Sequence, residues 1–191
     1  AGFAVILRVF SEAFGAPTWL SNQWGILFAV LSALTMTVGN VVALTQTNIK
    51  RLLGYSSIAH AGYMMMGLAA VGMARSELPL GQSGVLFYLA GYGLTNLGAF
   101  IAIIAISNKT GSDEVQDYSG MARRAPLLSL GLAFTLISLT GLPPTAGFMA
   151  KIYIFNAALQ SGLLWLVIFG VLNSVISAYY YLRVVKAMYL A

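Results

Sequence analysis

Five long stretches of the chain carry no charged residue, and apolar positions run through them without strict alternation. These stretches are residues 13–49, 52–74, 78–108, 125–150 and 152–182. Each reaches the roughly 20 residues that an α-helix needs to cross a bilayer. Membrane-spanning β-strands would alternate polar and apolar residues over about 10 positions. The pattern therefore predicts helices in a membrane, where every backbone group must find a partner within its own segment.

We expect an all-α membrane protein, a bundle of five complete transmembrane helices plus one partial helix. The partial helix covers residues 1–10, which have the pattern of a helix already in progress, so we expect the chain to be a fragment of a larger subunit. The complete helices together cover residues 24–187. Their predicted spans are residues 24–46, 54–74, 84–107, 126–155 and 163–187.

Composition agrees with a lipid environment. Of 191 residues 59% are hydrophobic and 8% are charged, whereas soluble domains carry about 25% charged residues. The chain has no cysteine, one histidine and five carboxylates, which argues against disulfides and against a metal site. The net charge of +5 does not indicate nucleic-acid binding, because the basic residues fall near predicted helix ends, where lipid head groups and membrane insertion account for them.

The basic residues divide unequally between the two ends of the predicted helices. Arg8 and Arg75 fall at one end. Seven others fall at the opposite end: Lys50, Arg51, Lys109, Arg123, Arg124, Arg183 and Lys186. Because Lys and Arg are retained on the cytoplasmic side of a membrane, we expect residues 47–53, residues 108–125 and the C-terminus to face the cytoplasm.

Lys151 is the main candidate for chemistry, because it lies inside a predicted span between two long uncharged runs. A cation at this depth costs about 2.5–3.5 kcal/mol on insertion scales and marks a functional site by default. Loss of water disfavours the charged form of an amine, so such a lysine can load and release a proton. The alternatives are a lysine that reaches an interface and a lysine in a fixed ion pair.

The same span contains a predicted helix break at Gly141, Pro143 and Pro144. Two adjacent prolines remove two backbone donors and clash with the preceding turn. Interrupted helices at membrane depth line cavities and form ion sites in transporters. We therefore expect the helix over 126–155 to break near 141–145 and to free carbonyl groups beside Lys151. A simple proline kink that improves packing is the structural alternative.

His60 is the only histidine, and its ordinary titration range suits a proton relay. Ser56, Ser57 and Tyr63 share its helix face by their spacing. A neutral histidine hydrogen-bonded between helices explains the position equally well. Further polar positions within the spans are Asn96, Asn173 and Ser177. These three can hold water in a chain, but interhelical hydrogen bonding is the commoner use of such residues.

Two segments resemble those of the antiporter-like membrane subunits of respiratory complex I. The first is LTQTNIKRLLGYSSIAHAGY over residues 44–63, and the second is SLTGLPPTAGFMAK over residues 138–151. The short sequence YYYLR over residues 179–183 adds to the likeness. The resemblance extends over the whole chain and implies that residues 24–187 are the second of two inverted five-helix repeats.

The resemblance also implies site residues. Lys151 matches a lysine that the family places in its proton path on a broken helix, and His60 matches a polar position on the family's central hydrophilic axis. Lys50 and Arg51 match a basic pair, which we interpret first as a topological anchor and second as a proton entrance. The family's first repeat, with its buried glutamate–lysine pair, is missing from this chain.

The implied function is proton translocation by a multi-pass subunit of bacterial NADH-quinone oxidoreductase in the plasma membrane, coupled to quinone reduction. Its partners would be the other membrane and peripheral subunits and the lipid bilayer. NADH, FMN, iron–sulfur clusters and quinone are expected in partner subunits, with no cofactor or redox site in this chain. Two alternatives remain open: a subunit of a multi-subunit cation/proton antiporter, and a structural membrane-arm component that conducts nothing.

Overall fold

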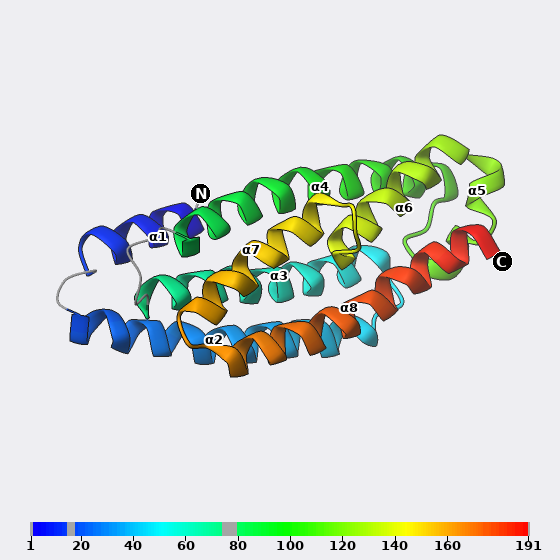
Figure 1. The fold of residues 1–191 in the computed structure, drawn as a ribbon. Helices are drawn as coiled ribbons and strands as arrows, with labels where there is room; N and C mark the ends of the chain where they lie inside the picture. The colour runs from blue at the N-terminus through cyan, green and yellow to red at the C-terminus, as the bar shows by residue number, and fades with distance from the viewer. Residues whose placement is uncertain (1, 15–17, 74–79, 191) are drawn as a thin grey trace.

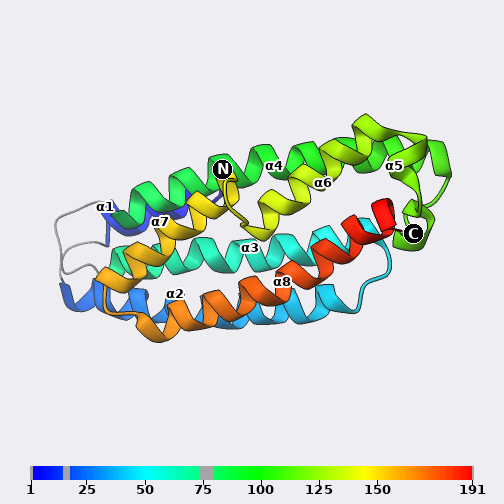
Figure 2. The same ribbon diagram turned by 45° about the vertical axis from the view of Figure 1, so that its right-hand side comes forward.

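The computed structural model describes residues 2–14, 18–73 and 80–190. Its long helices lie side by side along one common axis (Figure 1, Figure 2). The elements are α1 (Gly2–Glu12), α2 (Thr18–Leu44), α3 (Ile49–Gly72), α4 (Leu80–Thr110), the 3-10 helix η1 (Val115–Tyr118), α5 (Met121–Arg124), α6 (Pro126–Thr140), α7 (Ala146–Gln160) and α8 (Leu164–Leu190). The described part of the chain forms no β-strand, which confirms the predicted all-α class.

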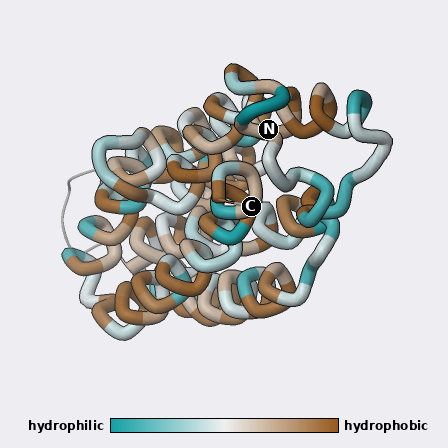
Figure 3. The backbone as a smooth tube through the Cα atoms, turned by 90° about the vertical axis from the view of Figure 1, so that its right-hand side faces the viewer, coloured by the Kyte–Doolittle hydropathy of each residue, from teal (hydrophilic) through white to brown (hydrophobic). Residues whose placement is uncertain are grey.

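Three of the described helices are long and apolar enough to cross a bilayer. They are α2, the segment Gly81–Thr110 of α4, and α8. The 27 residues of α2 correspond to about 40 Å of helix, more than the roughly 30 Å hydrocarbon layer. Hydrophobic residues are spread through the helices (Figure 3), and many of the large apolar side chains are exposed. An apolar exterior of this kind requires lipid or protein around it.

Helix α3 lies at the centre of the bundle, in contact with α2, α4, α7 and α8. Most of its residues are buried, and they include the polar side chains of Ser56 and His60. Helix α3 is long enough to span a bilayer but is less apolar than its neighbours. Its polar side chains are tolerated because they face other helices rather than lipid. It begins at Ile49 rather than at the predicted residue 54, since the Asn48 side chain accepts hydrogen bonds from the backbone nitrogens of Lys50 and Arg51 and caps the helix.

The predicted interruption of the helix over 126–155 is confirmed. Helix α6 ends at Thr140, and α7 begins at Ala146. Gly141 has φ +85°, a left-handed conformation that glycine adopts without steric cost. Thr145 then caps α7 by accepting a hydrogen bond from the Phe148 nitrogen. The two half-helices meet near mid-length of the bundle (Figure 1).

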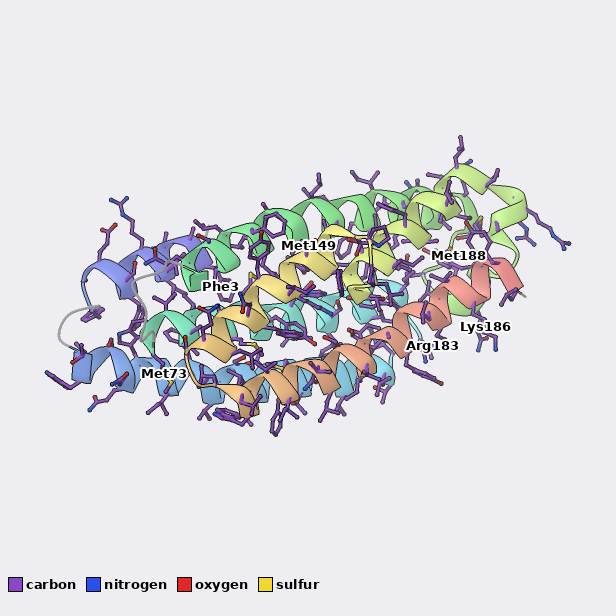
Figure 4. The ribbon with its side chains drawn as sticks, viewed as in Figure 1. Phe3, Met73, Met149, Arg183, Lys186 and Met188 are labelled. Carbon is purple, nitrogen blue, oxygen red and sulfur yellow. The ribbon has the colours of Figure 1, made fainter. Side chains whose placement is uncertain are left out.

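The basic residues that the sequence predicts on the cytoplasmic side lie together at one end of the bundle, here called the basic end. The 108–125 segment pairs with the α2–α3 turn, where the Ile49 nitrogen donates to the Asp113 carbonyl oxygen at 2.9 Å. Lys50 Nζ lies 2.8 Å from Asp113 Oδ1, and with the Ser107 hydroxyl it lowers the pKa of the Asp113 carboxyl. Arg183, near the C-terminal end of α8 (Figure 4), donates to the Leu44 and Gln46 carbonyl oxygens. Of the residues predicted at the opposite end, Arg75 lies outside the described ranges.

Helices α2 and α3 share the most extensive contact among the described helices, and glycines allow their close approach. A Cβ atom added at Gly62 would lie 2.6 Å from the Met36 nitrogen, and one at Gly39 would lie 2.6 Å from the Ala59 nitrogen. Membrane helices associate mainly through such close packing, because lipid offers no hydrophobic driving force. The packing holds α3 and its polar side chains in the centre.

We expect Gly62→Ala to destabilise the assembled protein by about 1–3 kcal/mol, because the methyl group overpacks a backbone contact. Gly54→Ala on the same helix is the matched control, since a Cβ there meets no atom within 4 Å. The control should be neutral or slightly stabilising, as alanine is the better helix former. Thermal inactivation of the detergent-purified protein measures both variants. Equal thermal stability of the two would contradict the packing argument.

Candidate functional site

Lys151 lies six residues into α7 and is buried, with 5% of its surface exposed. Its Nζ donates a hydrogen bond to the Thr140 carbonyl oxygen at 2.8 Å. That carbonyl is one of the last of α6 and has no amide partner within its own helix, because the helix stops there. The broken helix therefore supplies the acceptor for the lysine, with the partial negative charge of the α6 C-terminus behind it.

The face of the Tyr63 ring provides a second contact for the lysine. Lys151 Nζ lies 4.9 Å from the ring centroid, within the range of a cation–π interaction. The Tyr63 hydroxyl donates to the Gly170 carbonyl oxygen at 3.2 Å and lies 3.1 Å from Ser174 Oγ. Helix α8 thus fixes the ring that covers the amine.

His60 on α3 has a tyrosine hydroxyl at each ring nitrogen. Nδ1 lies 2.7 Å from the Tyr88 hydroxyl of α4, and Nε2 lies 3.2 Å from the Tyr181 hydroxyl of α8. The Tyr181 hydroxyl also bonds the Ser56 hydroxyl. The Tyr92 ring stacks on the imidazole at 4.7 Å between centroids. His60 of α3 is therefore hydrogen-bonded to two other helices, α4 and α8.

A small cavity joins the lysine and the histidine. His60, Tyr88 and Lys151 all line it, and Thr95 and Ser138 add hydroxyl groups. It has room for about one water molecule. A second, apolar groove beside the helix break is lined by Leu142, Phe155 and Val171 and reaches the other side of Lys151. Lys151 therefore lines both the cavity and the groove.

Two predicted site residues of α8, Asn173 and Ser177, do not line the cavity beside Lys151. Asn173 Nδ2 donates to Thr37 Oγ1 at 3.2 Å, and its Oδ1 accepts from Asn40 Nδ2 at 3.1 Å. Tyr180 donates to Asn40 Oδ1 at 2.9 Å. These bonds join α2 to α8, which is the interhelical use that the sequence favoured. Ser177 is buried but donates only to the Ser174 carbonyl oxygen of its own helix.

The remaining predicted residues lie around the periphery. Ser57 accepts from the Tyr92 hydroxyl at 2.7 Å and donates to the Leu53 carbonyl oxygen. Asn96 is half-buried on α4 and does not line the cavity, unlike its neighbour Thr95. Lys50 pairs with Asp113 at the basic end of the bundle and does not line the Lys151 cavity. This position agrees with the interpretation of Lys50 as a topological anchor.

Sequence reasoning missed the tyrosines around His60. In the run 179–181, Tyr179 is 65% exposed, while Tyr180 and Tyr181 are fully buried. Tyr180 contacts Asn40 of α2, and Tyr181 contacts His60 of α3. A four-residue spacing through positions 173, 177 and 181 was the available signal. Tyr88 had a similar signal, four residues before Tyr92.

The described residues contain no group of three His, Cys, Asp or Glu side chains placed to hold a metal ion. The polar atoms of the site are hydroxyls, one imidazole, one amine and freed carbonyls. Such groups bind and pass protons through hydrogen bonds. The arrangement is therefore suited to holding a proton at Lys151 or His60 and to exchanging it through hydroxyls and water.

Comparison with known proteins identifies the family of the chain. The family described as NADH:quinone oxidoreductase/Mrp antiporter, TM, matches residues 1–177. NADH-quinone oxidoreductase subunit N of Dehalococcoides mccartyi is 52% identical over the whole chain, which spans 39% of that protein's length. This relative confirms the resemblance stated from the motifs and places the likeness with subunit N.

Solved structures share the fold. A chain of respiratory complex I from Thermus thermophilus with bound NADH is 27% identical, with a TM-score of 0.83 over 96% of this chain and 38% of that chain. A chain of the Mrp complex from Dietzia sp. has a TM-score of 0.88 at 24% identity, covering 99% of this chain and 34% of that chain. The protein is therefore a membrane protein that belongs to the NADH:quinone oxidoreductase/Mrp antiporter family.

Proposed function

We propose that this chain carries a proton-transfer site of a proton-translocating membrane subunit in a bacterial NADH-quinone oxidoreductase. One observation carries the proposal: Lys151 is buried and has no carboxylate partner within the described ranges, where the ion pairs are Arg8–Glu12 and Lys50–Asp113. A structural lysine in a lasting ion pair would have such a partner. The helix break and the cavity shared with His60 further support a lysine that exchanges protons.

The contacts of Lys151 suit an amine that alternates between charged and neutral forms. Placing the charge at membrane depth costs about 2.5–3.5 kcal/mol. A hydrogen bond to a charged donor returns about 1.5–3 kcal/mol, and a cation–π contact about 0.5–2 kcal/mol. Because cost and compensation are of similar size, small changes in nearby charge can change the protonation state. Charges in neighbouring subunits would supply that change.

The proposed direction of transfer follows from the distribution of basic residues. Lys50, Arg51, Lys109 and Arg183 lie with the loops at one end of the bundle, and the retention of positive charge on the cytoplasmic side of membranes supports a cytoplasmic position for that end. Residues 47–53, residues 108–125 and the C-terminus would then be cytoplasmic. Lys151 would take a proton through water from the His60 side and release it toward the opposite face.

The wider setting is part of the same proposal. The chain spans about two fifths of the length of the curated relatives it matches, so a complete proton path and the coupling to quinone reduction belong to the whole subunit and its complex. NADH, FMN, iron–sulfur clusters and quinone would be bound by partner membrane and peripheral subunits. The lipid bilayer would cover the apolar outer faces of α2, α4 and α8.

A cation/proton antiporter is the second candidate, favoured by the fold shared with the Dietzia Mrp complex. That likeness is 24% identical, whereas the sequence is 52% identical to a subunit N. The site itself offers an amine, an imidazole and hydroxyls rather than a cage of oxygen ligands. Transport that depends on sodium, from a complex without redox subunits, would favour the antiporter.

The first test of this proposal is Lys151→Met in the assembled complex. Removing the amine should slow proton transfer through this subunit by about 100-fold or more, as loss of a positioned acid–base group does. Protons moved per NADH oxidised, measured in inverted vesicles, give the readout. Lys186→Met is the matched control, because Lys186 is exposed at the end of α8 and should leave pumping unchanged. Normal pumping by Lys151→Met at normal turnover would remove Lys151 from the mechanism.

Membrane orientation can be tested with single cysteines, since the chain has none. Gln116, in η1, and Gln160, at the end of α7, are exposed at opposite ends of the bundle. A maleimide that does not cross membranes should label Gln116→Cys in inverted vesicles and Gln160→Cys in intact spheroplasts. The reverse labelling pattern would overturn the proposed topology while leaving the site geometry untouched.

A further inference from the structure

The two hydroxyls on His60 satisfy the imidazole in either charge state. A neutral imidazole has one N–H donor and one acceptor nitrogen, while the charged ring donates from both nitrogens. Tyr88 and Tyr181 can each donate or accept by rotation of the hydroxyl hydrogen alone. Both hydrogen bonds therefore persist when His60 gains or loses a proton, and no heavy atom has to move.

The two tyrosines face different surroundings. Tyr88 lines the cavity that also contains Lys151, and Tyr181 does not line it. Tyr181 instead bonds Ser56, one turn earlier on α3 and nearer the basic end of the bundle. Both tyrosines are almost fully buried, at 2% and 0% exposure. The imidazole thus separates a hydroxyl chain on one side from the lysine cavity on the other.

We propose that the Tyr88 hydroxyl passes protons between His60 and the cavity beside Lys151, with Tyr181 and Ser56 serving the opposite ring nitrogen. The proposal rests on the proton-transfer function of Lys151 proposed above. It assigns a role to Tyr88 and Tyr181, and it makes His60 a relay rather than a structural histidine. It also makes the cavity a binding site for one bridging water.

Each group in the proposed relay receives one proton and passes one on. Ser56 gives its hydroxyl proton to Tyr181 and regains one from water on the side of the basic end. Tyr181 gives its own proton to Nε2 of His60, whose Nδ1 proton goes to the Tyr88 oxygen. Tyr88 then gives its hydroxyl proton to the bridging water, and that water protonates the neutral Lys151 amine. This leaves the imidazole with its proton on Nε2, so the ring must turn over and the hydroxyls must rotate back before Nε2 can accept the next proton.

The deciding variant is Tyr88→Phe in the assembled complex, which removes one hydroxyl and keeps the ring. We expect protons pumped per NADH oxidised to fall in inverted vesicles, with transfer through this subunit slowed about tenfold or more. Quinone reduction by uncoupled vesicles should stay near the wild-type rate, which a merely damaged fold would not allow. Tyr181→Phe should give the same loss of pumping, because it removes the next hydroxyl of the chain.

Tyr118→Phe is the matched control, because Tyr118 is fully buried and its hydroxyl donates only to the Ile103 carbonyl oxygen, at the basic end. The Tyr118→Phe complex should pump as many protons per NADH oxidised as the wild type.

If Tyr88→Phe fails to assemble, Tyr181→Phe decides the question alone. Wild-type pumping by either assembled variant overturns the proposed relay. Loss of pumping in Lys151→Met with no loss in the tyrosine variants would reject the relay and keep the function; normal pumping in Lys151→Met would reject both.

Discussion

The hydrogen bond from Lys151 to the Thr140 carbonyl oxygen is the interaction on which the site depends. It exists because α6 stops at Thr140 and because Pro144, four residues on, has no amide hydrogen to donate to that carbonyl. Gly141 takes the left-handed turn, and its lack of a side chain leaves room for the lysine. A Cβ there would lie 2.9 Å from Lys151 Cδ. The break therefore makes both the acceptor and the space for the amine.

The packing of helices around α3 brings His60 and its hydrogen-bond partners close to Lys151 and the helix break. α3 brings His60 and Tyr63 to the centre, and the close glycine contacts with α2 hold it there. α4 and α8 then add hydroxyls to the imidazole from two directions. Because hydroxyls both donate and accept, this interior can satisfy its polar groups in more than one protonation state. A dry apolar interior would hold the same helices but could not exchange a proton.

The basic end of the bundle has a different role. Lys50, Asp113 and Arg183 tie the 108–125 segment and the α2–α3 turn to the end of α8. These contacts fix the loops that carry most of the positive charge, and positive charge near helix ends sets orientation in a membrane. The same chain therefore separates its charges into an exposed group that orients it and a single buried amine that performs the proposed chemistry.

The sequence by itself determined the helical class and the break near Gly141, and it placed the charge of Lys151 within an otherwise uncharged stretch. These follow from local rules, because uncharged length, proline geometry and the cost of a buried charge are properties of short segments. Only the tertiary structure decided which side chains meet. Tyr88, Tyr181 and the Thr140 carbonyl join His60 or Lys151 through contacts between helices distant in sequence. Helical periodicity shows which residues share a face, but the rotation and pairing of helices, set by packing, determine what that face contacts.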